Sequence, residues 1–131
     1  MLSPLGLSKA ERIHSRLVVE SLFSGRNSSI AVYPLRIVWT TTESTDADSA
    51  PFASILISVP KKRMHHAVDR NRMKRMVREA YRLNKQLLLS RLEGSNRHVD
   101  IAFICIADNM PASSQVSKSV IKALARISDT I

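Results

Sequence analysis

Residues 67–92 have the sequence AVDRNRMKRMVREAYRLNKQLLLSRL, which contains neither glycine nor proline. On a helical wheel at about 100° per residue, counted from Arg70, the side chains separate into two faces. An arc of about 140° holds Asn71 and the cations Arg70, Lys74, Arg75, Arg78, Arg82 and Lys85. A stripe from about 220° to about 340° holds Met73, Met76, Val77, Ala80, Leu83 and Leu87, and Arg72 flanks it at about 200°. The pattern predicts one long helix with a core face and a cationic face.

The net charge of the chain is concentrated around this helix. The whole sequence carries +9, and residues 61–85 hold ten basic and two acidic side chains, or +8. The remaining 106 residues hold ten basic and nine acidic side chains, or +1. Because a solvated helix face normally mixes the two signs, six cations on one arc indicate a polyanionic partner, RNA or DNA. Lys61, Lys62 and Arg63 precede the helix and extend the basic surface.

A basic amphipathic helix is also typical of calmodulin targets and of proteins that lie on membranes. The apolar stripe of this helix is needed for the core, which disfavours the membrane alternative. No apolar stretch approaches the roughly 20 residues that span a bilayer, and the N-terminus lacks the pattern of a signal peptide. The single cysteine, Cys105, suits a reducing compartment. We therefore expect a cytoplasmic protein.

The rest of the chain predicts short elements around this helix. A helix is expected over residues 11–23, strands over 30–41, 52–59 and 99–107, and a last helix after Pro111. The last helix has an apolar stripe of Val116, Val120, Ile121, Leu124 and Ile127. In the first strand, the predicted core face holds Tyr33, Leu35, Ile37 and Trp39, while Pro34 favours an edge position or a bulge.

The order of these elements predicts the α+β class. We expect a two-layer sandwich in which helices pack on a small, mostly antiparallel sheet of about four strands, in the order α-β-β-(β)-α-β-α. The first two strands, joined by the polar segment 42–51, are expected to form an antiparallel pair. Residues 1–131 are expected to form a single domain, with residues 1–8 as a loose arm and 42–51 as a mobile loop. General rules assign a right-handed crossover to the strand–helix–strand segment 52–107.

The sequence offers no active site carried by the protein itself. His65 and His66 are adjacent, so they point apart on a helix, and no further metal ligand stands at a suitable spacing. The chain has only three glycines and no glycine-rich phosphate loop. Its carboxylates are scattered singly, which disfavours a nuclease with its own metal cluster. We expect neither catalytic residues nor a metal site in the protein.

The segment from Ala67 to Arg82 closely resembles the signature of the bacterial ribonuclease P protein component. The signature has an Ala-Val-x-Arg-Asn-Arg-x-Lys-Arg core followed by Arg-Glu, which here runs from Ala67 through Arg78 and Glu79. The expected order of elements also matches that family across nearly the whole chain. The resemblance implies a small subunit of a ribonucleoprotein endonuclease that removes the 5′ leader from precursor tRNA.

The resemblance further implies how the work is divided. The ribonuclease P RNA subunit holds the catalytic Mg²⁺ ions, while the protein binds that RNA, holds the leader in a cleft of its sheet, and assists substrate affinity and metal binding. The protein is expected to be monomeric, with one RNA subunit and precursor tRNA as its partners, and without DNA or a membrane. Family membership also implies a left-handed crossover, contrary to the general rule.

The family's roles carry over to matching positions. The RNA-subunit role falls on Arg70, Asn71, Arg72, Lys74, Arg75 and Arg78, and the charge pattern adds Lys61, Lys62, Arg63, Arg82 and Lys85. The leader cleft is assigned Val19, Phe23 and Arg36, of which Phe23 matches a family aromatic. The sequence departs from the family pattern in having Val19 in place of a second aromatic and His65 in place of a glycine. It also lacks the arginine that is common after the last strand, near Asp108.

Composition and helical periodicity alone leave three alternatives to a ribonuclease P subunit. A non-catalytic RNA-binding module of similar fold fits both observations equally well, and only the Arg70-Asn71-Arg72 run separates it from the first hypothesis. A DNA-binding regulator would need a helix-turn-helix pair and usually a dimer surface, and neither is visible. A self-sufficient nuclease would need the acidic cluster that the sequence lacks.

Overall fold

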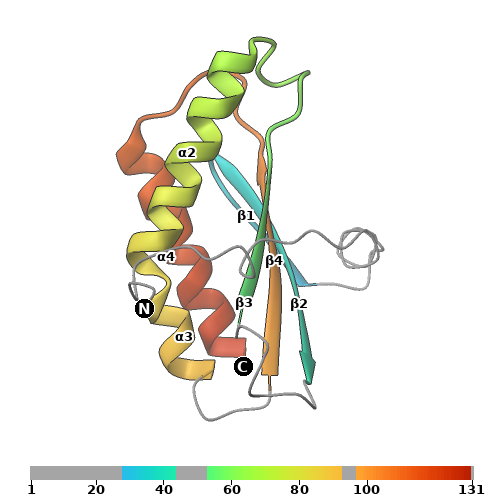
Figure 1. The fold of residues 1–131 in the computed structure, drawn as a ribbon, viewed down its shortest axis with the longest axis vertical. Coiled ribbons are helices and arrows are strands. Elements are labelled where there is room, and N and C mark those ends of the chain that lie inside the picture. The colour runs from blue at the N-terminus through green and yellow to red at the C-terminus, as the bar shows by residue number, and fades with distance from the viewer. Residues whose placement is uncertain (1–27, 44–52, 93–96, 131) are drawn as a thin grey trace, which may run out of the picture.

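The computed structural model describes residues 28–43, 53–92 and 97–130. Its elements are β1 (Ser28–Val32), β2 (Leu35–Glu43), β3 (Ala53–Ser58), α2 (Ala67–Asn84), α3 (Gln86–Leu92), β4 (Arg97–Cys105) and α4 (Ser113–Thr130). The three helices lie together on one face of the four-stranded sheet (Figure 1). The predicted α+β sandwich is therefore confirmed. The expected arm 1–8 and helix 11–23 lie outside the described residues.

The sheet has the order β1-β2-β4-β3. β2 is antiparallel to both β1 and β4, whereas β3 is parallel to β4. The predicted strands 30–41 and 52–59, which correspond to β2 and β3 here, were expected to pair with each other. This prediction was wrong, because β4 lies between β2 and β3 and bonds to both. β4 is an interior strand and is buried on both sides of the sheet, with Ala102 and Phe103 on opposite faces and both fully buried. The left hand of the β3-to-β4 crossover stays a prediction from the resemblance.

A turn at Tyr33 and Pro34 divides the predicted strand 30–41 into β1 and β2. Proline has no N–H group to donate, and here it lies between the strands, where its carbonyl accepts a 3.0 Å bond from the Ile106 N–H. Tyr33 is consequently 59% exposed, so its predicted place in the core was wrong. β2 continues to Glu43, which makes the first two residues of the expected loop 42–51 part of a strand.

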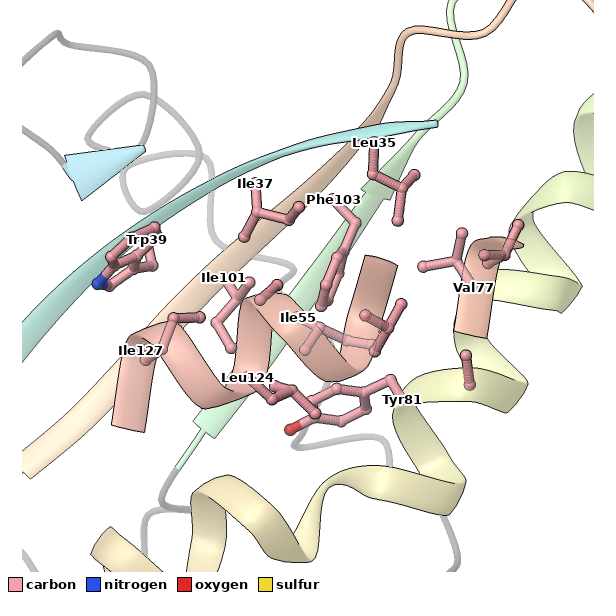
Figure 2. Packing of buried hydrophobic residues seen from close by; sticks show 14 of the residues in the cluster. Leu35, Ile37, Trp39, Ile55, Val77, Tyr81, Ile101, Phe103, Leu124 and Ile127 are labelled. Atoms are coloured by element: carbon pink, nitrogen blue, oxygen red, sulfur yellow. The ribbon is translucent and has the colours of Figure 1, made fainter. Parts of the chain in front are cut away.

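The core lies between the sheet and the helices. Leu35, Ile37 and Trp39 alternate along β2, and all three point toward the helices (Figure 2). The register places Ile37 beside Phe103 of β4, and the Phe103 ring meets Tyr81 of α2 edge to face, with centroids 6.1 Å apart. This contact joins the helix layer to the sheet.

The predicted helix 67–92 is interrupted at Lys85, which separates α2 from α3. The Asn84 side chain donates a 2.8 Å bond to the Ala80 carbonyl, and the Lys85 carbonyl accepts bonds from the N–H groups of Leu88 and Leu89. α3 is held to α4 by a bond of 3.1 Å from the Ser128 hydroxyl to the Leu87 carbonyl. The prediction of one continuous helix was therefore wrong.

The last helix, α4, begins with a reciprocal cap. The Gln115 side chain accepts a 3.3 Å bond from the Ala112 N–H, and the Ala112 carbonyl accepts bonds from Gln115 and Val116. The predicted apolar stripe is buried, apart from Ile121, which is 38% exposed. The buried Ser119 donates a 2.6 Å bond to the Val32 carbonyl of β1, which fixes α4 over the edge of the sheet.

Candidate nucleic-acid interface

Helix α2 is rotated about its axis relative to the sequence prediction. Its buried residues are Met73, Val77, Ala80 and Tyr81. Tyr81 falls at about 20° on the wheel, inside the predicted basic arc, yet it is fully buried against Phe103. Leu83, predicted for the core, is 52% exposed. The large ring of Tyr81 turns that side of the helix inward, and the exposed face is centred closer to Arg72 and Arg75 than the wheel predicted.

Two cations of the predicted binding set are turned toward the protein. Arg70 Nη1 donates to the carbonyls of Met64, at 3.1 Å, and His65, at 2.8 Å. Lys85 is only 3% exposed, so its predicted place on the RNA-binding face was wrong. On the wheel Lys85 falls at about 60°, close to the buried Tyr81 at about 20°, so the same rotation of the helix turns Lys85 inward.

The other arginines of α2 line a groove, which we call the arginine groove. α2 forms one wall of this groove, and the first turns of α4 form the other. The groove has a volume of about 960 Å³. Four arginines and three serines line it, namely Arg72, Arg75, Arg78, Arg82, Ser113, Ser114 and Ser117. The helical rise spaces Arg72 and Arg82 about 15 Å apart along α2. This length suits several consecutive phosphates better than a single small anion.

Of the described residues that line the groove, one is a carboxylate, Glu79, and it is already paired. Arg82 donates to it through Nε, at 3.1 Å from Oε2, and through Nη2 to Oε1. The hydrogen bond from Arg82 lowers the pKa of Glu79, and the same bond raises the pKa of Arg82. Within the described part of the chain, no ion pair engages Arg72, Arg75 or Arg78. The groove is therefore electropositive.

The turn before α2 carries three more of the predicted cations. Lys61 and Lys62 are exposed. Arg63 forms a 3.1 Å ion pair with Asp108, which follows β4, so the departure at Asp108 supplies a partner for the basic turn. On α2 itself, Asn71 is exposed and Lys74 is half-buried. None of these residues lines the groove.

The predicted leader residues are only partly described. Arg36 is exposed on β2 and points away from the helices, because its neighbours in sequence, Leu35 and Ile37, point toward them. Val19 and Phe23 lie outside the described residues, so the predicted cleft is represented here by Arg36 alone. The same face of the sheet holds a pair that the sequence analysis missed: His98 Nε2 lies 2.9 Å from Asp100 Oδ1.

The described residues also bear on other kinds of site. They contain no group of three or more His, Cys, Asp or Glu side chains that could hold a metal ion. Cys105 is 1% exposed, and burial raises the pKa of its thiol, which donates to the Ala107 carbonyl. None of the described helices combines the length and the apolar character needed to cross a bilayer.

Fold and groove together define an α+β sandwich protein with an arginine-lined surface suited to a polyanion. The family model described as Ribonuclease P matches residues 7–128. The chain is 41% identical over 133 residues to the ribonuclease P protein component of Porphyromonas gingivalis, covering 100% of this chain and 94% of that protein. It is 36% identical over 105 residues to the ribonuclease P protein component of Chlorobium phaeobacteroides, covering 76% of this chain and 71% of that protein. The chain belongs to the ribonuclease P protein family, and its role is that of a protein component in tRNA processing.

Solved structures support the same fold. The ribonuclease P protein of Staphylococcus aureus superposes with a TM-score of 0.65 at 23% identity, covering 91% of this chain and 95% of that one. The Thermotoga maritima ribonuclease P protein gives a TM-score of 0.65 at 21% identity, covering 88% of this chain and 96% of that one. This chain therefore has the fold of these ribonuclease P proteins.

Proposed function

We propose that this protein binds the ribonuclease P RNA subunit through the arginine groove and the 5′ leader of precursor tRNA through the opposite face of the sheet. The RNA subunit, with Mg²⁺, carries out the endonucleolytic cleavage, and the protein assists it. One protein binds one RNA subunit. Family membership supports this role, and the groove supports the assignment of the surface.

The groove is the observation that carries the proposal. Guanidinium groups bind phosphates in a bidentate manner, and four of them lie along about 15 Å of one helix. Such crowding of like charges costs stability unless a polyanion neutralises it. Arg72 and Arg75 are exposed and have no ion-pair partner among the described residues, so they are available to RNA phosphates.

The assignment of the leader rests on the other face of the sheet. Arg36 is exposed there, and the helices cover the opposite face, so one molecule can contact the RNA subunit and the leader at the same time. Val19 and Phe23 complete the proposed leader contact by resemblance to the family.

Reconstitution tests this function. The purified protein is added to its RNA subunit and precursor tRNA at low Mg²⁺, where the RNA alone cleaves slowly. We expect the protein to accelerate release of the 5′ leader, because it raises substrate affinity and assists metal binding. Arg36→Ala should weaken substrate affinity while leaving binding of the RNA subunit unchanged. No acceleration by the wild-type protein would contradict the proposal.

A further inference from the structure

The α4 wall of the arginine groove has no assigned role. α4 is separated from α2 in sequence by α3 and β4, yet the two helices pack side by side (Figure 1). The side chains that α4 contributes to the groove are the hydroxyls of Ser113, Ser114 and Ser117. Ser113 and Ser114 are exposed.

We infer that Ser113, Ser114 and Ser117 are RNA-subunit contacts that hold, from the side opposite the arginines, a phosphodiester backbone lying in the groove. The inference rests on the proposed function and deepens it. A hydroxyl donates a hydrogen bond to a phosphate oxygen, and serine is among the side chains that contact phosphates in nucleic-acid complexes. A phosphate in the groove would receive charged bonds from α2 and neutral bonds from α4.

The composition of the groove favours the backbone of RNA over its bases. Among the residues that the structure describes, the lining contains no aromatic side chain, so these residues offer no platform on which a base could stack. Serine side chains are small and leave the groove open to a chain of phosphates. The length of about 15 Å between Arg72 and Arg82 exceeds what one phosphate needs. The ligand that fits is a continuous phosphodiester strand, recognised without regard to sequence.

The α4 wall with its three serines, called the serine wall from here on, has a fixed position in the fold. Gln115 caps the first turn of α4 through the Ala112 N–H, at 3.3 Å. Ser119, one turn further along the helix, bonds to the carbonyl of Val32 in β1 at 2.6 Å. These two bonds anchor the stretch that carries the three serines, so the hydroxyls keep their place opposite α2 before RNA arrives.

A charge placed on the serine wall tests the inference. Ser114→Glu adds a carboxylate to the groove, and the matched control Ala125→Glu adds one to an exposed position further along α4, outside this groove. Acidic residues are favourable in the first turn of a helix, so Ser114→Glu should fold, which circular dichroism and thermal melting check. We expect Ser114→Glu to weaken RNA-subunit binding by about tenfold or more at low salt, and Ala125→Glu by much less.

Three further measurements separate the outcomes. A triple substitution of Ser113, Ser114 and Ser117 by alanine should weaken RNA-subunit binding several-fold. The affinity of holoenzyme, assembled at saturating protein, for precursor tRNA should not change with Ser114→Glu. Arg72→Ala is measured in parallel and reports on the proposed function.

The inference is overturned if Ser114→Glu binds the RNA subunit no more weakly than Ala125→Glu while Arg72→Ala binds weakly. It is also overturned if Ser114→Glu lowers only the affinity for precursor tRNA, because the groove would then belong to the substrate. If neither Ser114→Glu nor Arg72→Ala affects binding of the RNA subunit, the proposed function of the groove fails together with the inference.

Discussion

Arg70 Nη1 donates a hydrogen bond of 2.8 Å to the carbonyl of His65, on the turn that precedes its own helix. The same nitrogen lies 3.1 Å from the Met64 carbonyl. The first arginine of the Arg70-Asn71-Arg72 run therefore supports the turn that carries Lys61 and Lys62, whereas Arg72 faces the groove. Two arginines separated by one residue thus have different tasks.

This division predicts that two equal changes of charge affect the stability of the protein differently. Arg70→Gln loses charge-assisted bonds to the two carbonyls and should lower the free energy of unfolding by about 1–3 kcal/mol. Arg72→Gln should change it by no more than about 0.5 kcal/mol, because Arg72 is exposed. Urea denaturation of the two variants measures the difference. Equal stability of both variants would contradict the structural role of Arg70.

Glu79 is predicted to restrain the groove. Replacing it with glutamine removes a carboxylate from the lining and releases Arg82 from this ion pair. RNA-subunit affinity at low salt should rise, and the salt dependence should steepen by up to about one phosphate contact. A filter-binding titration over a range of salt concentrations measures both quantities. Weaker binding by Glu79→Gln would show that the pair positions Arg82 instead.

The pKa of Glu79 fixes how the pair responds to pH. Because Arg82 lowers this pKa, the carboxylate of the folded protein is charged at every pH above the ordinary pKa of a glutamate. The ion pair is lost only as the pH falls through the lowered pKa. Between about pH 6 and 8 the contribution of Glu79 to RNA binding should be constant. The ratio of wild-type to Glu79→Gln affinity, measured across that range, should therefore stay flat.

Lys85 is predicted to act in folding. Its side chain is 3% exposed at the junction of α2 and α3, so Lys85→Ala removes a buried stem and its polar contacts. The variant should lose about 1–3 kcal/mol of unfolding free energy and keep the salt dependence of RNA binding. Chemical denaturation and salt titration report these two effects separately. A reduced salt dependence with unchanged stability would return Lys85 to the RNA-binding face.

Cys105 is predicted to be unreactive in the folded protein. It is 1% exposed, and burial raises the pKa of its thiol, which leaves little thiolate at neutral pH. A thiol reagent should therefore label it slowly under native conditions and quickly in denaturant. Rapid labelling of the native protein would mean that β4 opens readily at its end.

The sequence predicted most of the fold because the apolar patterns were strong. Alternation along β2 and the continuous apolar run of β4 identified the sheet, and the stripe of α4 identified its core face. The order of the strands depends on which segments meet in space, so the placement of β4 between β2 and β3 was not visible in local periodicity. Pro34 pointed to an irregularity but not to a hairpin.

The site was predicted in outline, with errors at its edges. Charge density and the family motif found α2, but a wheel assumes a straight helix and weighs all side chains equally. The burial of Tyr81 against Phe103 rotated the exposed face, and the same rotation turned Lys85 inward. The serine wall had no sequence signal, because Ser113 and Ser114 read as an ordinary helix start.

The central claim, that the arginine face of α2 binds the RNA subunit, is tested most directly by the salt dependence of binding. The variant Arg72→Ala/Arg75→Ala is compared with Lys122→Ala/Arg126→Ala, which removes two exposed cations from α4 that do not line the groove. The slope of log affinity against log salt should fall by about two contacts in the first variant and should not change in the second. Equal slopes in both variants and the wild-type protein would contradict the claim.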